Sequence, residues 1–325
     1  MERIAAQSTD PAPSARLGGW GKKGLRIAKR LVWPLFRFIL LAGLSFVILY
    51  PFIAKISAMF MSLDDLQNPT VWLVPQSPTL DNIRRVFAYG DYWRALGNTV
   101  LVSLTCAVLQ TLSCTIVGYG FAKFKFRGRG LFFALAVLTI IIPPQTIYIS
   151  LYMKFRYFDV FGLLSLLGVG PLKLVEQITP MAILSFTALG LKNGLYIFVM
   201  RQFFRGVPRE LNEAAWVDGC GPIRTFYVIM LPMARSMMVS IFLLSFAWQW
   251  TDTFYSSLFY RQMLVLPNIL SKITVITSDA IGKGTMMSNV MLNTGVILII
   301  APLIVFYLIS QKFFIQGVER SGLVG

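Results

Sequence analysis

The sequence predicts an all-α integral membrane protein with six membrane-spanning helices, and three observations support this fold class. The 325 residues are 56% hydrophobic and 14% charged, with a mean hydropathy of +0.67, whereas a soluble domain is about 45–50% apolar and about 25% charged. Six apolar runs are each long enough to cross a bilayer. The basic residues are divided unevenly between the loops that join these runs.

The N-terminal segment 1–33 is rich in small, polar and basic residues. We interpret it as a mobile basic cytoplasmic arm ahead of an uncleaved signal-anchor, because a cleavable signal peptide has a shorter charged region and a shorter apolar stretch. A six-helix transmembrane domain is then expected over 34–310, and residues 311–325 are expected to form a cytoplasmic C-terminal tail.

The six apolar runs meet the length requirement for membrane crossing, since a core of about 30 Å takes roughly 20 helical residues. The fourth run is the least regular, because Lys192, Asn193 and Gly194 interrupt it near its middle. Proline occurs inside the runs, as at Pro143 and Pro302, and membrane spans tolerate it better than soluble helices do. The expected spans are 34–58, 97–121, 131–151, 179–203, 233–256 and 289–310.

The charge distribution predicts the topology. Residues 1–37, 122–130, 201–235 and 311–325 together hold 19 Lys and Arg, whereas the three opposite loops, 61–94, 152–178 and 257–288, hold nine. Basic residues collect on the cytoplasmic side of membrane proteins, so both termini are expected there. The net charge of +16 then needs no nucleic-acid partner.

Several kinds of chemistry are excluded or disfavoured. The chain has no histidine, which removes imidazole acid–base catalysis and histidine metal ligands. Its three cysteines form no C-x-x-C pair, so we expect neither a zinc site nor a disulfide framework. No G-x-x-x-x-G-K-[ST] sequence is present to hold ATP phosphates. We therefore expect no catalytic site, metal or bound cofactor on this chain, and any ATP and Mg on a partner.

The fourth loop, about 205–232, is the most informative segment. Pro208 predicts a helix start, and acidic residues follow in the first turns. Gly219 and Gly221 allow a sharp reversal, and Pro232 can open the next helix because no N–H is needed at that position. Taken alone, these residues also describe an ordinary amphipathic connecting helix.

From Glu213 to Pro232 the loop reads E-A-A-x-x-x-G-x9-I-x-L-P without a gap. This motif resembles the cytoplasmic coupling loop of permease subunits in bacterial ABC importers. The flanking residues 200–204 and 208–211 resemble the carbohydrate-importer branch, the maltose-type inner permease family. Residues 248–254 resemble that branch's W-N-x-F region, although Thr251 stands where Asn is usual and Ser236 replaces a common Pro. The likeness starts near residue 35 and leaves the substrate subgroup open.

The resemblance implies a six-span type I importer permease in the bacterial plasma membrane. It implies four kinds of partner: a second homologous permease, two ATP-binding subunits, an extracytoplasmic solute-binding protein and the lipid bilayer. ATP would close the ATPase dimer, and the docked helices would switch the spans between inward-facing and outward-facing states. The residues implied to couple the chain to the ATPase are Glu210, Glu213, Ala214, Ala215, Asp218 and Gly219. Arg205 and Arg209 either assist there or are ordinary cytoplasmic loop charges.

Candidate substrate contacts lie in the fourth and fifth runs. Lys192 is an ionisable residue within a span, which usually faces a cavity or a partner; alternatively it extends toward the membrane surface, marks a helix break or pairs at a subunit interface. The candidate pathway residues are Lys192, Asn193, Tyr196, Trp248, Trp250 and Asp252.

We expect an ATP-driven importer permease for an oligosaccharide or related sugar. The alternatives are an ABC permease for a non-sugar solute, and an ATP-independent carrier or channel.

Overall fold

The computed structural model describes residues 19–160, 162–208, 210–280 and 286–320. The chain forms two compact units, Met1–Lys55 and Ile56–Gly325. Both units are helical in the described residues, where the only strand-like feature is an isolated bridge between Phe158 and Leu172. The all-α prediction is thus confirmed for the described part of the chain.

The first unit is made by α1 (Gly19–Met59), which continues into the second unit for its last residues. Its part from Val32 onward is apolar, with a mean hydropathy of 2.1, and the side chains from Val32 to Leu49 are exposed. Exposed apolar residues on a helix of this length suit contact with lipid. The helix begins inside the segment 1–33 that we assigned to a mobile arm, so the arm is helical from Gly19 onward. Residues 1–18 lie outside the described part.

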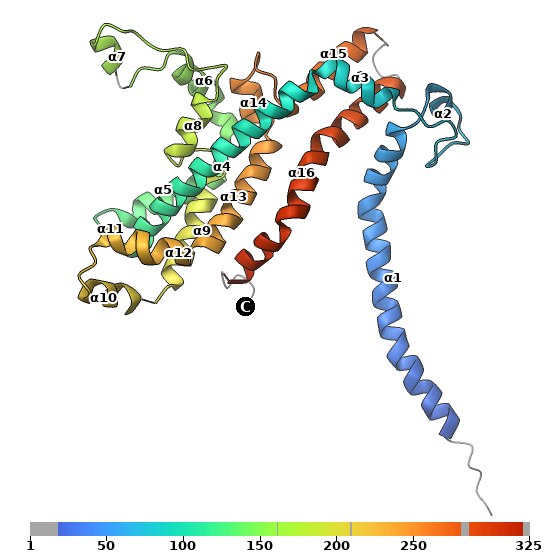
Figure 1. Ribbon diagram of the computed structural model, residues 1–325, viewed down its shortest axis with the longest axis horizontal. Helices are drawn as coiled ribbons and strands as arrows, with labels where there is room; N and C mark the ends of the chain where they lie inside the picture. The colour runs from blue at the N-terminus through green and yellow to red at the C-terminus, as the bar shows by residue number, and fades with distance from the viewer. Residues whose placement is uncertain (1–18, 161, 209, 281–285, 321–325) are drawn as a thin grey trace, which may run out of the picture. The chain divides into compact units, whose positions relative to one another are not determined.

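The second unit contains the remaining helices (Figure 1). In chain order these are α2 (Leu63–Gln67), α3 (Asp81–Gly90), α4 (Tyr92–Lys123), α5 (Arg129–Ile141), η1 (Pro144–Ile147), α6 (Tyr148–Arg156), α7 (Leu163–Leu166), α8 (Thr179–Phe186), α9 (Asn193–Gly206), α10 (Glu210–Val217), α11 (Pro222–Thr225), the π-helical η2 (Phe226–Met230), α12 (Leu231–Met233), α13 (Arg235–Trp250), α14 (Phe254–Phe259), α15 (Leu266–Ala280) and α16 (Met286–Arg320).

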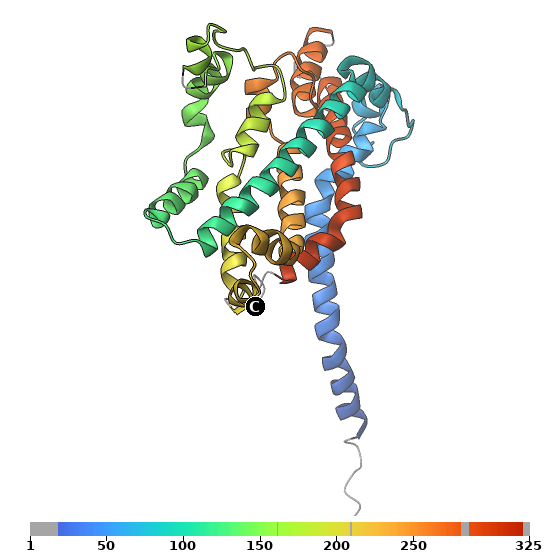
Figure 2. The same cartoon turned by 60° about the vertical axis from the view of Figure 1, so that its left-hand side comes forward.

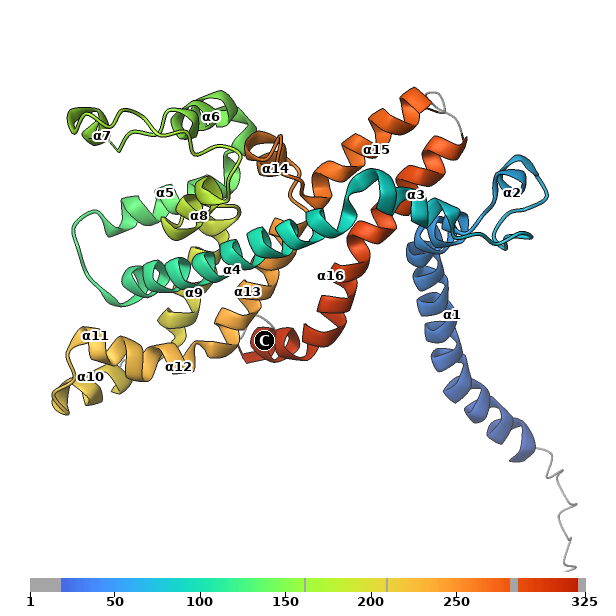
Figure 3. The same cartoon turned by 45° about the horizontal axis from the view of Figure 1, so that its top comes forward.

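Helix α4 is the centre of this unit and packs against α8, α9, α13 and α15 (Figures 1 and 3). Its buried residues recur every three or four positions, as in Val102, Cys106 and Gln110, which is the spacing of one helix face. The contact with α9 is the closest, because a Cβ added at Gly118 would lie 2.5 Å from the Cβ of Met200. All three apolar clusters of the unit include residues of α4.

Three described helices have the length and composition of single membrane spans: Val32–Met59, Tyr92–Lys123 and Met286–Phe313. Two bent pairs also qualify if each pair counts as one span. The run 131–151 does not form one helix, since α5 and the 144–156 segment meet at 98° after Pro143-Pro144, and 222–233 meets α13 at 72°. The proline pair explains the first bend, because proline removes a helical N–H and excludes helical geometry at the residue before it.

The fourth predicted span, 179–203, is divided into α8 and α9. The connection contains two non-glycine residues with positive φ, Ala188 at 58° and Lys192 at 61°. A left-handed residue ends a right-handed helix, so the interruption expected at Lys192 is a break of the backbone itself.

The proline in α16 is compensated by neighbouring helices. Pro302 has no N–H to donate to the carbonyl of Leu298, four residues earlier. The hydroxyl of Tyr92 donates to that carbonyl at 2.9 Å, and the indole N–H of Trp250 donates to the next carbonyl, Ile299, at 3.0 Å. These two bonds attach α16 to α4 and α13.

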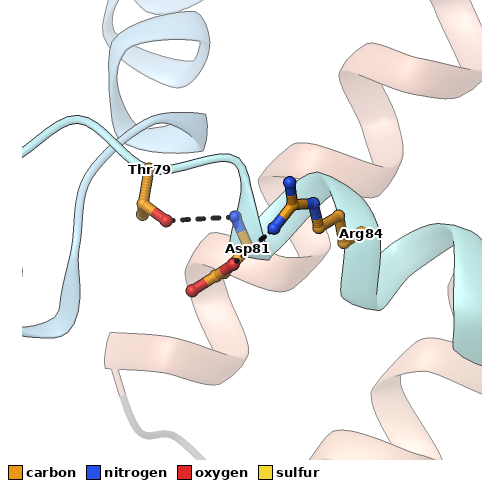
Figure 4. A network of polar contacts seen from close by, with 3 residues as sticks. All are labelled: Thr79, Asp81 and Arg84. Atoms are coloured by element: carbon orange, nitrogen blue, oxygen red, sulfur yellow. Dashed lines mark hydrogen bonds and ion pairs between the residues drawn. The ribbon is translucent and has the colours of Figure 1, made fainter.

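The loop 61–94 is ordered by its own polar residues. Asp65 is buried and accepts from the backbone of Ser77 at 3.0 Å, while the Asn82 amide donates to the carbonyls of Met59 and Met61. At the start of α3, the backbone N–H of Asp81 donates to Thr79, and the Asp81 carboxylate pairs with Arg84 at 3.6 Å (Figure 4). The loop is therefore a folded element rather than a loose tether.

Candidate functional site

The loop predicted to contact an ATPase lies at one end of the second unit, beyond α9 and α12, and α6 and α7 lie at the other end (Figures 1 and 2). Val207, which follows α9, is buried, and its carbonyl accepts from the Lys123 ammonium at 3.0 Å. A helix, α10, begins at Glu210, as expected after Pro208. Arg209 is outside the described residues, and Arg205 is exposed at the end of α9.

The turn after α10 has the geometry of a Schellman motif. The N–H of Cys220 donates to the carbonyl of Ala215 at 2.8 Å, and the N–H of Gly219 donates to Trp216 at 3.1 Å. Gly219 has φ of 76°, a conformation that glycine adopts at little cost. The predicted reversal at Gly219 is thus present in the backbone.

The side chains of α10 divide into a buried and an exposed set. Asn212 and Ala215 are buried, at 8% and 3% exposure. Ala214 is exposed, so the two adjacent alanines do not share a face. We use the term α10 surface for a set of exposed residues of α10 and its flanks, which are Glu210, Leu211, Glu213, Ala214, Trp216, Val217, Asp218 and Ile223.

Large apolar side chains distinguish the α10 surface from an ordinary polar loop. Trp216 is 58% exposed, Val217 87% and Ile223 75%. Exposed apolar residues among charges are typical of a protein interaction site. We did not single out these three residues from the sequence, although an adjacent Trp and Val in a loop assigned to the cytoplasm was a usable signal.

Two candidate pathway residues from different spans come together. Lys192 lies at the break before α9 and is exposed, and Trp248 on α13 is 47% exposed. The Lys192 ammonium lies 4.8 Å from the centre of the Trp248 ring, within the range of a cation–π interaction. The sequence identified both residues but did not predict this contact.

The other candidates in the fifth run have structural partners. Trp250 is 2% exposed and donates to Ile299. Asp252 is buried, and its carboxylate accepts from the backbone N–H of Ser256 at 3.1 Å in the first turn of α14. Their positions are explained by packing and helix capping without a substrate.

Asn193 and Tyr196 are buried in the contact between α4 and α9. Asn193 is 2% exposed and Tyr196 1%. Among the described residues, neither the amide of Asn193 nor the hydroxyl of Tyr196 has a hydrogen-bond partner, and the same holds for the Gln249 amide on α13. Unpaired polar groups are costly in a packed interior, so these side chains retain unused hydrogen-bonding capacity.

The end of the unit opposite α10 has an arginine–tyrosine cluster, made by Tyr148, Tyr152, Arg156, Tyr157 and Arg261. Arg261 donates to the hydroxyl of Tyr148 at 3.3 Å, and its guanidinium lies 5.5 Å from the Tyr152 ring. The bond to Tyr148 raises the pKa of Arg261 above its usual value. Nearby, hydrogen bonds from the Ser165 hydroxyl and from the backbone of Leu164 and Ser165 lower the pKa of Asp159.

Comparison with known proteins identifies the class of protein that has this fold. A family described as "Binding-protein-dependent transport system inner membrane component" matches residues 114–320, which include the α10 loop. The chain belongs to this family. It is a membrane component of an ABC importer, as the motif predicted, and not itself a catalyst, since ATP is hydrolysed on a partner subunit.

Curated relatives match nearly the whole chain. The arabinooligosaccharides transport system permease protein AraQ of Halalkalibacterium halodurans is 26% identical over 310 residues, covering 91% of this chain and 100% of the relative. The maltodextrin transport system permease protein MdxG of Bacillus subtilis is 26% identical over 301 residues, covering 91% of this chain and 98% of the relative. The predicted resemblance to sugar importer permeases is thereby confirmed.

A solved structure has a similar fold. The crystal structure of a bacterial ABC transporter involved in the import of the acidic polysaccharide alginate aligns with a TM-score of 0.68 at 20% identity, over 88% of this chain and 98% of that chain. A second structure, of a bacterial alginate ABC transporter in complex with an alginate pentasaccharide-bound periplasmic protein, aligns with a TM-score of 0.60 at 16% identity, over 89% and 97% of the two chains. At these identities the likeness concerns the fold.

Proposed function

We propose that this chain is a permease subunit of an ATP-driven importer for an oligosaccharide or related sugar, and that the α10 surface docks on a separate ATPase. The observation that carries the proposal is the α10 surface itself: an exposed apolar and acidic helix, fixed by a glycine turn, at one end of the unit. The sugar assignment is supported by the curated relatives, which are named for arabinooligosaccharide and maltodextrin transport.

The proposed assembly contains a second homologous permease, two ATPase subunits that hold ATP and Mg, and an extracytoplasmic solute-binding protein. The chain crosses the bacterial plasma membrane six times with both termini in the cytoplasm. The loop charges support this orientation, and the broken α8–α9 segment and the two bent pairs supply the spans beyond the three continuous helices.

ATP-driven motion would reach the membrane through the α10 loop. The loop is continuous with α9 on one side and with α11, η2 and α12 on the other, and the latter connect to α13. A rigid-body shift of α10 therefore acts on α9, which begins directly after Lys192, and on α13, which carries Trp248. These are the two candidate pathway residues with exposed side chains, and the pathway proposal rests on them.

The first test is mass spectrometry of the proteins that co-purify with this chain from gently solubilised native membranes. We expect an ATPase with a Walker A motif and a second permease. A chain that purifies alone, even after cross-linking at the partly exposed, free Cys220, would instead indicate an ATP-independent carrier or channel. Competition by labelled solutes in an uptake assay separates a sugar from a non-sugar substrate.

The second test is mutation of the loop. Gly219→Val and Glu213→Lys should each abolish uptake while membrane insertion stays normal, because the turn or the acidic contact is lost and the spans are not. Gly221→Ala is the matched control, since Gly221 has φ of −66° and open space at its Cβ position. Normal uptake in both loop variants would overturn the assignment of the α10 surface.

A further inference from the structure

Lys192 lies in the fourth proposed span, and the described residues place no counter-charge beside it. In the part of the chain that the structure describes, no carboxylate lies within ion-pairing distance of its ammonium, and its recorded contact is the ring of Trp248. A charged side chain within the bilayer is costly and usually faces a cavity, a partner or a ligand. Lys192 lies at the chain break and has a left-handed backbone conformation, with φ of 61°. Lysine adopts this conformation rarely.

The distance of Lys192 and Trp248 from the α10 loop can be estimated along two helices. Helix α9 has 14 residues between Lys192 and the α10 loop, or about 20 Å at the helical rise per residue. The segment of α13 from Arg235 to Trp248 also spans about 20 Å. The two estimates agree. With the α10 loop at the cytoplasmic surface of the proposed membrane domain, the pair would lie inside a hydrocarbon core of about 30 Å.

The chemistry of the pair defines the ligand that it fits. An indole ring offers a flat apolar surface on which a sugar ring can stack, and an ammonium offers three donors to a carboxylate. A carboxylate also supplies the counter-charge that Lys192 lacks, and charge-assisted hydrogen bonds are the stronger ones. A neutral sugar would leave the cation unpaired.

The cluster at the end opposite α10 has the same combination of groups. Arg156 lies 5.8 Å from the Tyr157 ring and Arg261 lies 5.5 Å from the Tyr152 ring. Tyr148 and Tyr152 pack on the same apolar cluster as Leu191, the residue before Lys192. Cation–aromatic pairs therefore occur both at this end and at the deeper Lys192.

We propose that Lys192 and Trp248 form a subsite for a sugar ring that carries a carboxylate, so that the transported solute is an acidic, uronate-containing oligosaccharide. This inference rests on the proposed function as a sugar importer permease and specifies its substrate class. Lys192 pairs with the carboxylate, and Trp248 stacks on the ring.

The test uses the assembled transporter, purified with its ATPase and partner permease and without the solute-binding protein. Binding of trisaccharides of galacturonate, glucuronate and mannuronate is measured by titration calorimetry, with their neutral counterparts as reference. We expect at least one acidic trisaccharide to bind more tightly than its neutral counterpart. Lys192→Met should weaken that binding about 10- to 100-fold, the effect of losing one charge-assisted hydrogen bond, and Lys192→Arg should retain most of it.

Lys312→Met is the matched control, because Lys312 also lies over an aromatic ring, Phe313, at 5.0 Å but at the far end of α16. It should bind as the wild type does. Trp248→Ala should weaken both acidic and neutral trisaccharides, since it removes the stacking surface.

Equal binding of acidic and neutral trisaccharides, no binding of any acidic one, or unchanged binding in Lys192→Met overturns the inference. The same preparations show whether the ATPase subunit is present and active, so a failure of the proposed function is seen separately. If Lys192 only extends toward lipid headgroups, Lys192→Met will bind the acidic trisaccharide as tightly as the wild type does.

Discussion

The α10 surface and the contact between α4 and α9 differ in how far their apolar side chains are exposed. On the α10 surface, Trp216 and Val217 are exposed by more than half. In the α4–α9 contact, Met200 is fully buried, and Gly118 brings the two helices so close that an added methyl group would overlap a side chain. The α4–α9 contact is closely packed within this chain, whereas we propose that a partner covers the α10 surface. Mutations should therefore affect folding at the α4–α9 contact and assembly at the α10 surface.

The largest effect is expected for Gly118→Ala. The new Cβ would lie 2.5 Å from the Cβ of Met200, so α4 and α9 must separate, at a cost of about 3 kcal/mol. We expect a clear loss of Tm and of yield in detergent. Gly120→Ala is the control on the same helix, where an added Cβ meets nothing within 4 Å. That change should be neutral or stabilising, and an equal loss in both variants would contradict the packing argument.

Trp216→Ala should have the next largest effect, and on assembly rather than on folding. Truncation of an aromatic residue at the centre of an interface costs about 2 kcal/mol, or roughly 30-fold in affinity for the ATPase. Tm of the isolated chain should not change, because Trp216 is mostly exposed. Trp72→Ala provides the control, since Trp72 is 77% exposed on the 61–94 loop. If pull-down of the ATPase is undiminished, the α10 surface is not the docking site.

Tyr92→Phe should destabilise the chain by about 1–2 kcal/mol, because it removes the donor to the Leu298 carbonyl that Pro302 leaves without a helical partner. Tyr196→Phe is the matched change at a buried tyrosine whose hydroxyl has no partner in the described part of the chain, and it should be neutral or stabilising. Thermal denaturation of both variants without substrate measures the difference. The opposite order would disprove the role given to the Tyr92 bond.

The smallest effect is expected for Asp252→Asn. The carboxylate accepts from the backbone of Ser256, and an amide oxygen can replace it, so the cost should be about 0.5 kcal/mol. Uptake should stay close to that of the wild type. A strong loss of uptake with unchanged Tm would show that Asp252 contacts the solute, as the sequence had suggested.

The sequence predicted the elements that depend on local composition. The long spans in α4 and α16 follow from length and hydropathy, and α10 with its Gly219 turn follows from proline and glycine positions and from the motif. Hydropathy could not show that the run 131–151 bends by 98° or that 179–203 divides in two, because an apolar run has the same composition whether its backbone is straight or broken.

The different environments of Trp248 and Trp250 could also be found only from the structure. The two residues belong to one short motif, yet residues two apart lie on nearly opposite sides of a helix. One is half-exposed beside Lys192 and the other is fully packed against α16. Only the packing of α13 against its neighbours decides which face is inside.

The two hydrogen bonds at Pro302 have a mechanical consequence. A proline in a long helix normally provides a flexible hinge, but here Tyr92 and Trp250 bind two adjacent carbonyls, those of Leu298 and Ile299, one turn before Pro302. The joint in α16 is thus stiffened, and α16 moves together with α4 and the end of α13. Motion that enters through α10 must then be absorbed at other breaks, of which the 72° bend before α13 and the α8–α9 connection are connected most directly to α10. The second of these ends at Lys192, so one of the breaks that can absorb the motion and the proposed cargo contact are adjacent in the chain.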